Sequence, residues 1–172
     1  MKRLHFLFLL VFSVALFSSC KKDGMEYGFD YAKSLRKWTA FKDSSHNSYR
    51  YKVVAGSWVG YGWETIITIK DGKPIGRSFL MQGRLNGSAT ITTMEQWTED
   101  EASLSTHGRG ASPVTLDEIY KKAKEEWLLK RDNTETYFET KNNGMISSCG
   151  YRDKNCADDC FIGVTITLIE AI

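Results

Sequence analysis

The dipeptide Asp71-Gly72 separates two predicted strands, residues 63–70 and about 75–81. An Asp-Gly pair between two strands is the strongest short-range signal for a β-hairpin with a two-residue turn. Consecutive strands that are joined by such a short turn must run antiparallel. This hairpin therefore restricts the chain to folds that contain an antiparallel sheet.

Further strand patterns lie on both sides of this hairpin. Tyr49, Tyr51 and Val53 alternate with charged residues, which is typical of a half-buried strand. Strands are also predicted at residues 134–140, 145–151 and 161–169, and a fourth short strand could form at 89–93. In the last strand, one face is expected to hold Ile162, Val164, Ile166 and Leu168.

Two helices are predicted from apolar spacing. In the first, Asp30 is the expected N-cap, and an apolar stripe includes Tyr31, Leu35, Trp38 and Phe41 or Lys42. In the second, Thr115 and Glu118 form a capping box ahead of the stripe Leu116, Ile119, Tyr120, Ala123, Trp127 and Leu128. Each helix needs an apolar partner, and the sheet supplies one.

We therefore expect a single α+β domain over residues 29–172, with two helices packed on one face of an antiparallel sheet of about six or seven strands. The expected order is helix, three or four strands, helix, three strands. A domain of this length buries enough surface to be stable without a cofactor. The segment 83–113 is ambiguous, because it could be one long loop or hide a short helix at 98–104.

The first twenty residues have the pattern of a bacterial lipoprotein signal. Lys2 and Arg3 precede an apolar run at 6–17, which is shorter than the ~20 residues that a membrane-spanning helix needs. Ser18-Ser19-Cys20 then resembles the cleavage site of such signals. We expect residues 1–19 to be removed and Cys20 to be acylated, with 20–28 as a tether to the membrane.

Without that signal the chain carries 21 basic and 21 acidic residues, so nothing in its charge favours a nucleic-acid partner. The start Ser-Cys-Lys-Lys-Asp is similar to lipoproteins of the Bacteroidetes group, in which delivery to the outer membrane is usual. The sequence is compatible with either orientation, toward the periplasm or toward the cell exterior.

The stretch 94–169 also resembles a group of small uncharacterised bacterial lipoproteins. The resemblance rests on 95–101 (EQWTEDE), 115–120 (TLDEIY), 143–146 (NGMI) and 156–160 (CADDC). It supports a lipid-anchored envelope protein and implies no activity.

Three cysteines remain after Cys20, in a compartment that permits disulfides. We predict a bond between Cys156 and Cys160, which share one loop, and a free, buried thiol at Cys149. A folded-back loop or a strand bulge could instead join Cys149 to Cys156.

Groups able to perform catalysis are scarce. Only His46 and His107 remain beyond the signal, and the chain has no hydrolase elbow, metal-ligand spacing or cofactor fingerprint. We therefore expect a non-enzymatic protein without metal or cofactor. The alternative is a small hydrolase or lyase with an acid/His site around Glu99 and His107.

Aromatic residues are the best candidates for a binding surface. Trp58, Tyr61 and Trp63 lie among glycines, a pattern that suits either a stacking platform or ordinary core packing. Trp97 and His107 are the further candidates. The expected partner is an envelope protein, a peptide or a glycan.

Overall fold

The computed structural model describes residues 24–57, 59–84, 89–158 and 160–172, so the predicted signal peptide, Cys20 and Trp58 lie outside the described residues. The chain forms helices and strands in the order α2 (Gly28–Ser44), β1 (Tyr49–Ser57), β2 (Tyr61–Lys70), β3 (Lys73–Arg84), β4 (Ile91–Asp100), α3 (Leu116–Lys122), the π-helical turn η1 (Ala123–Trp127), β5 (Thr134–Glu139), β6 (Ser148–Asp153) and β7 (Ile162–Ala171).

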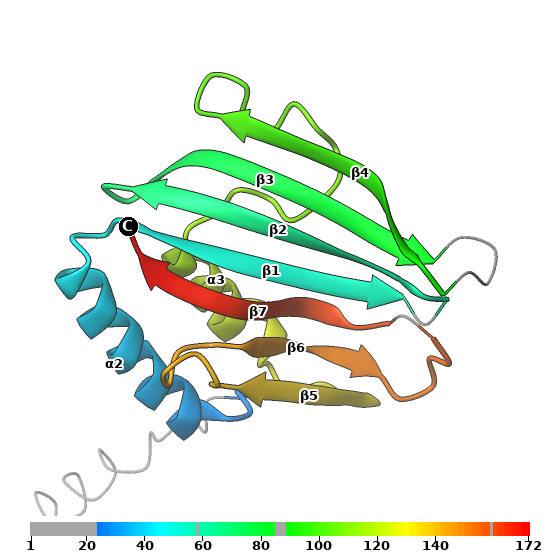
Figure 1. The fold of residues 1–172 in the computed structure, drawn as a ribbon. Helices are drawn as coiled ribbons and strands as arrows, with labels where there is room; N and C mark the ends of the chain where they lie inside the picture. The colour runs from blue at the N-terminus through cyan, green and yellow to red at the C-terminus, as the bar shows by residue number, and fades with distance from the viewer. Residues whose placement is uncertain (1–23, 58, 85–88, 159) are drawn as a thin grey trace, which may run out of the picture.

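The strands form one antiparallel sheet with the order β4-β3-β2-β1-β7-β6-β5 (Figure 1). β1 and β7 pair at its centre and so join the four strands that precede α3 to the three that follow it. The predicted α+β class, with helices and an antiparallel sheet, is confirmed.

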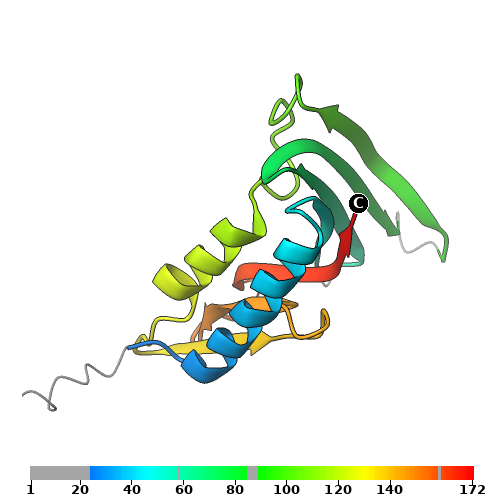
Figure 2. The same ribbon diagram turned by 90° about the vertical axis from the view of Figure 1, so that its left-hand side faces the viewer.

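Both helices lie on the same side of the sheet (Figure 2). Their apolar stripes pack on the inward side chains of β1, and Trp38 of α2 meets Tyr49 edge-on with ring centroids 5.0 Å apart. The Tyr49 hydroxyl accepts the backbone N–H of Leu116 at 2.9 Å, so this buried polar group is satisfied. These aromatic residues join the sheet and both helices into one core.

The Asp71-Gly72 turn is confirmed. Asp71 and Gly72 have φ angles of 49° and 78°, the left-handed values that a two-residue type I′ turn requires, and Lys70 pairs with Lys73 across it. The capping box is also confirmed, because Thr115 Oγ1 accepts the Glu118 N–H at 3.2 Å and Glu118 Oε2 accepts the Thr115 N–H at 2.7 Å.

The N-cap prediction for the first helix is wrong. α2 begins at Gly28 after Tyr27, and no side chain caps it. Asp30 lies in the first turn, where its negative charge is favourable beside the helix dipole. The segment Gly24–Glu26 pairs with residues 128–130 just before α2, and this pairing sets where the helix starts.

Two strand predictions are also corrected. β4 extends over Ile91–Asp100 along β3, so 98–104 holds no helix and Asp100 begins a turn instead. β6 begins at Ser148 rather than at 145, since Met145 and Ile146 lie buried in the connection before it.

The predicted face of the last strand is wrong beyond Ile166. The pairing with β1 shifts between Lys52 and Val53, so that β7 carries one extra residue there. This bulge brings Ile169, 9% exposed, to the core face and moves Leu168 beside Lys52 on the other face.

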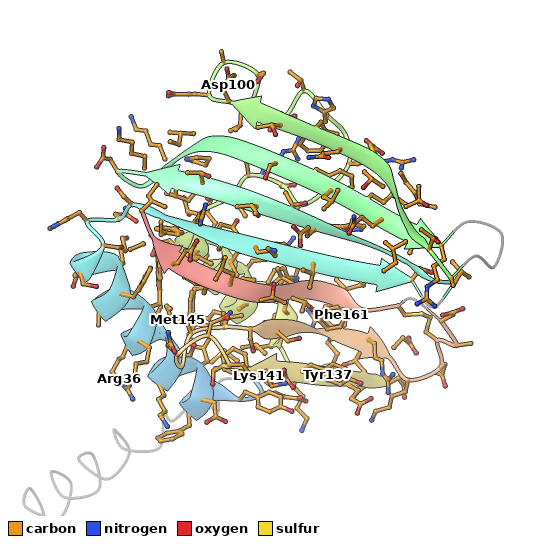
Figure 3. All side chains as sticks on the ribbon, viewed as in Figure 1. Arg36, Asp100, Tyr137, Lys141, Met145 and Phe161 are labelled. Carbon is orange, nitrogen blue, oxygen red and sulfur yellow. A yellow bond between two sulfur atoms is a disulfide. The ribbon has the colours of Figure 1, made fainter. Side chains whose placement is uncertain are left out.

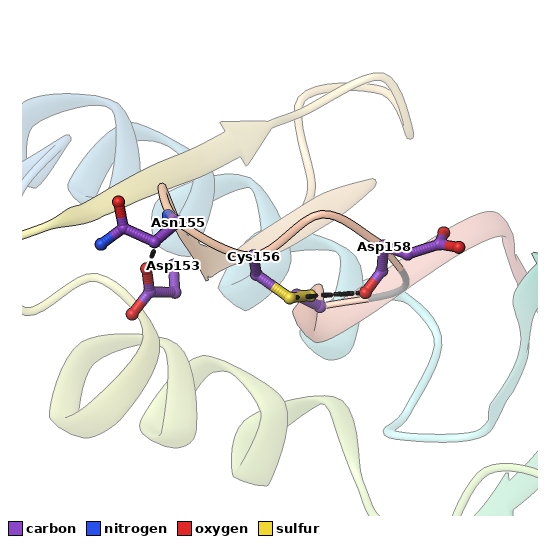
Figure 4. Close-up of a disulfide and its surroundings, with 5 residues drawn as sticks. Asp153, Asn155, Cys156 and Asp158 are labelled. Carbon is purple, nitrogen blue, oxygen red and sulfur yellow. Dashed lines mark hydrogen bonds between the residues drawn. A yellow bond between two sulfur atoms is a disulfide. The ribbon is translucent and has the colours of Figure 1, made fainter.

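The predicted Cys156–Cys160 disulfide is confirmed, with Cα atoms 6.2 Å apart in the β6–β7 connection (Figure 4). Cys149 is a free, fully buried thiol on β6. The Asp158 carbonyl oxygen lies 3.4 Å from Cys156 Sγ, and Asp153 Oδ1 accepts the Asn155 N–H at 2.7 Å, which tightens the turn.

Candidate functional site

The loop 101–115 lies against the helix side of β2–β4 and is anchored by Arg77. The Arg77 side chain lies on the same face of β3 as that of buried Phe79, the face toward the helices, and is 4% exposed. Its guanidinium donates to Glu99 of β4 and to three loop carbonyls, those of His107, Arg109 and Ala111, at 2.8–3.4 Å. All five N–H donors of this buried side chain thus find acceptors.

Glu99 holds the loop from the other side. Its carboxylate accepts the backbone N–H groups of Ser105 and His107 at 2.9 and 2.7 Å, in addition to the bidentate Arg77 pair. The Arg77 contact and these backbone donors hold the pKa of Glu99 well below its usual value, although burial opposes them. Glu99 is therefore ionised at neutral pH, and a carboxylate with a strongly lowered pKa is a weak general acid or base.

His107 and Trp97 form a ring stack on this network. The His107 ring lies parallel to Trp97 with centroids 4.4 Å apart, and Trp97 stacks on Phe79 at 5.1 Å. His107 Nδ1 is 3.0 Å from Glu99 Oε1, and the Arg77 guanidinium lies 4.7 Å from the centre of the Trp97 ring. Both predicted binding residues are thus part of the packing that fixes the loop.

Gly110 lets the loop approach the sheet closely. Its φ angle is 81°, and a Cβ there would lie 2.7 Å from Thr65 Oγ1 and 2.9 Å from the Phe79 ring. Thr65 Oγ1 also accepts the Ala111 N–H at 3.0 Å. Only glycine fits both this conformation and this space.

A cleft of about 300 Å³ opens where the loop leaves the sheet. We call it the aromatic cleft, and it is lined by Tyr61, Trp63, Phe79, Met81, Arg109 and Gly110. Tyr61 and Trp63 lie on the same face of β2 as Thr65, the face toward the helices, and Met81 of β3 pairs directly with Trp63. Its volume is at the lower end of the range for small-ligand sites.

The aromatic cleft carries one ion pair at its mouth. Arg109 Nη1 donates to Glu95 Oε2 at 3.0 Å, and the Arg109 side chain is 66% exposed. Tyr61 is 40% exposed, whereas Trp63 is partly buried against the core. The cleft thus offers an apolar, aromatic wall next to a cation and an anion that remain accessible to a ligand.

A broader hollow of about 460 Å³ lies at the same end of the sheet. Its floor includes Val54, Glu64 and Leu80, which pair in register on the face opposite to the helices. Lys52 donates to Glu64 at 2.8 Å and neutralises its charge. Trp63 also lines this hollow, but Tyr61, Phe79 and Arg109 do not, so we consider it the weaker candidate.

The structure brings together part of the predicted binding set. Tyr61 and Trp63 line the aromatic cleft, Trp97 and His107 lie in the neighbouring ring stack, and Trp58 lies outside the described residues. The sequence interpretation missed Arg77, and it included Arg109 only as the end of a loop, residues 95–109, that could join the binding surface. The sequence did hold a signal for Arg77. This charged residue alternates with Phe79 and Met81 along the predicted strand, which places it on the apolar face.

Comparisons with protein-family models, curated proteins and solved structures found no match to this chain. The resemblance to small lipoproteins therefore stays a prediction. Among the described residues, no group of three or more His, Cys, Asp or Glu side chains could hold a metal ion. In the same part of the chain, the helices are too short or too polar to cross a membrane.

Proposed function

We propose that this chain is a lipid-anchored protein of the outer membrane that binds an envelope protein, peptide or glycan through the aromatic cleft. The main support for binding is that Tyr61, Trp63 and Arg109 line the same cleft. Arg109 is 46 residues from Trp63 in the sequence, so the fold brings these side chains together. Aromatic and arginine side chains are the commonest strong contacts at interfaces.

The site is preorganised, which favours binding. The Arg77–Glu99 network and Gly110 fix the loop that carries Arg109 before any ligand arrives. A fixed wall loses little conformational entropy when a ligand binds. A sugar ring or the side chain of a peptide could stack on Tyr61 and Trp63, while Arg109 and Glu95 bond to its polar groups.

The anchoring half is supported by the signal pattern that ends at Cys20 and by the charge balance of the remaining chain. Binding on a lipid tether raises the effective concentration of the cleft near membrane-bound partners.

The test is retention of separated envelope proteins, peptidoglycan fragments and surface glycans on the immobilised protein. We expect one fraction to bind, and Tyr61→Ala or Arg109→Ala to weaken that binding by about 1–2 kcal/mol, roughly 5–30-fold. Lys73→Ala is a matched control for Arg109→Ala, because Lys73 is an exposed cation that lies outside the cleft.

Thermal midpoints separate binding from folding in this test. Tyr61→Ala should leave the midpoint nearly unchanged, whereas Trp63→Ala should lower it because Trp63 packs against the core. Equal retention of the bound fraction by the wild type and both cleft variants would contradict the proposal.

The second candidate is a small hydrolase or lyase that uses His107. Its support is the 3.0 Å contact between His107 Nδ1 and Glu99, since a carboxylate can orient an imidazole for proton transfer. Against it, Glu99 is occupied by Arg77, and the residues that line the cleft do not include His107. Turnover of an ester, peptide or glycoside that disappears in His107→Ala would favour this candidate.

A further inference from the structure

The outer side of α2 carries a stripe of exposed residues. Phe29, Lys33, Arg36, Lys37 and Ala40 are all exposed and lie opposite the buried residues Tyr31, Ser34 and Trp38. Their spacing of three, four and seven residues places them on one face of a helix. Arg36 projects away from the sheet in Figure 3.

The middle of this α2 stripe is positively charged, and the two exposed acids of the helix, Asp30 and Asp43, lie at its ends. Between Tyr31 and Lys42 the helix contains no acid, and Asp30 and Asp43 are the only acids of α2. Lys33, Arg36 and Lys37 take part in none of the salt bridges among the described residues, whereas Lys42 is paired with Asp117. Three cations on one helix face thus have no salt-bridge partner in the part of the chain that the structure describes.

The α2 stripe begins close to the point where the chain leaves the fold. The Lys130 N–H donates to the Gly24 carbonyl at 2.6 Å and the Glu26 N–H to the Leu128 carbonyl at 2.7 Å, so residues 24–26 are fixed to the domain. Four residue steps separate Cys20 from Gly24, and they span at most about 14 Å. An acyl group on Cys20 would therefore hold the start of α2 at the bilayer surface.

Apolar side chains surround this same point. Phe29 is 79% exposed, Tyr27 is 43% exposed and Leu129, opposite Met25, is 38% exposed. Aromatic residues favour the interface between headgroups and acyl chains, and Lys21 and Lys22 add positive charge beside the anchor.

We propose that α2 lies on the anionic surface of the bilayer that holds the Cys20 anchor, with the α2 stripe against the phospholipid headgroups. This inference rests on the proposed lipid anchor and adds an orientation to it. Phe29 inserts beside the anchor, and Lys33, Arg36 and Lys37 bind phosphate groups along the helix. The aromatic cleft, which α2 does not line, stays open to partners.

The experiment uses the acylated mature chain, which begins at Cys20, in vesicles of phosphatidylcholine alone or mixed with phosphatidylglycerol. A fluorophore is attached at Ala40→Cys, or at Glu101→Cys beyond β4, near Asp100 in Figure 3. Cys149 is buried and stays unlabelled in the folded protein. A nitroxide on the lipid headgroups then reports which label lies near the membrane.

We expect strong quenching at Ala40→Cys and little at Glu101→Cys in the anionic vesicles. Replacing Lys33, Arg36 and Lys37 by Gln should remove most of the quenching, because each cation contributes about fivefold to attraction by an anionic surface. Arg84, Lys124 and Lys154 changed to Gln are the matched control and should have no effect, since these exposed cations lie outside α2.

Two negative results can be told apart. A chain that fails to float even with neutral vesicles overturns the anchor and the orientation together. A chain that floats, but whose Ala40→Cys label is quenched no more than the Glu101→Cys label, overturns the orientation alone. Quenching that the triple Gln variant retains shows that the anchor, and not the α2 stripe, places the helix, and this also overturns the inference.

Discussion

At the scale of single residues, one buried ion pair determines where the loop 101–115 lies. Arg77 and Glu99 have little or no exposed side-chain area, and together they bond to backbone groups of Ser105, His107, Arg109 and Ala111. Removing one member of such a pair leaves the other charge buried without compensation.

We predict that Glu99→Gln lowers the free energy of unfolding at neutral pH by about 3–5 kcal/mol. Because the pKa of Glu99 is lowered from 4.5 in the folded state, its contribution is fully present above about pH 4.5. That contribution is lost as the pH falls through the lower, folded-state pKa. The variant should therefore lose less stability on acidification than the wild type.

Urea unfolding at neutral pH and at about pH 3 measures this difference. Glu101→Gln is the matched control, because Glu101 is an exposed acid just beyond β4. An identical loss of stability on acidification in wild type and Glu99→Gln would show that Glu99 does not carry the pH dependence.

Cys149 is a second residue whose environment predicts its chemistry. Burial raises the pKa of its thiol to about 12, so almost no reactive thiolate exists near neutral pH. We expect no alkylation of the folded protein and one alkylated cysteine per mature chain, apart from Cys20, after unfolding without reductant. Peptide mapping that finds Cys149 in a disulfide would contradict this.

At the scale of elements, β4 shows how neighbours select a conformation. Its residues 98–100 carry two acids and could start a helix, yet Glu99 is placed opposite Arg77 by the pairing of β4 with β3. The strand therefore continues to Asp100, and the chain turns there through bonds between Asp100 and Ser103.

The loop that follows β4 depends on Gly110. We predict that Gly110→Ala costs about 1–3 kcal/mol of stability, because the added Cβ would meet Thr65 and Phe79 at a positive φ angle. Gly108→Ala should change stability by less than about 0.5 kcal/mol, since no atom lies within 4 Å of its added Cβ. Equal urea midpoints for the two variants would contradict the close packing of the loop.

At the scale of the whole molecule, the described helices and the loop after β4 all lie on one face of the sheet (Figure 2). α2 and α3 cover the inward side of the centre, and the loop 101–115 covers the inward side of β2–β4 (Figures 1 and 2). The aromatic cleft lies at the edge of this cover. The fold thus separates the cleft from the start of α2, where the predicted tether joins the domain.

The predicted lipid anchor on Cys20 would determine the location of the whole molecule. We expect the mature protein to begin at acylated Cys20, and Cys20→Ala to block processing or to release the protein from membranes. Fractionation of cells that express each form measures this. A Cys20→Ala protein that is cleaved normally and still sediments with membranes would show that the lipoprotein interpretation is wrong.

Local sequence was sufficient for features that depend on neighbours in the chain. Asp71-Gly72 fixes a turn through its own backbone preference, Thr115 and Glu118 cap each other, and Cys156 and Cys160 lie close enough in sequence to bond. The α+β class followed from these signals and from the strand and helix periodicities.

Other features depend on contacts between distant segments, and these contacts exist only in the folded chain. The β7 bulge that turns Ile169 inward arises from pairing with β1, and the extent of β4 arises from pairing with β3. The aromatic cleft needs Arg109 beside Tyr61, and that neighbourhood exists because buried Arg77 bonds to a loop some 30 residues away. Periodicity reports the faces of one element, whereas a cleft forms from side chains whose positions depend on the whole sheet.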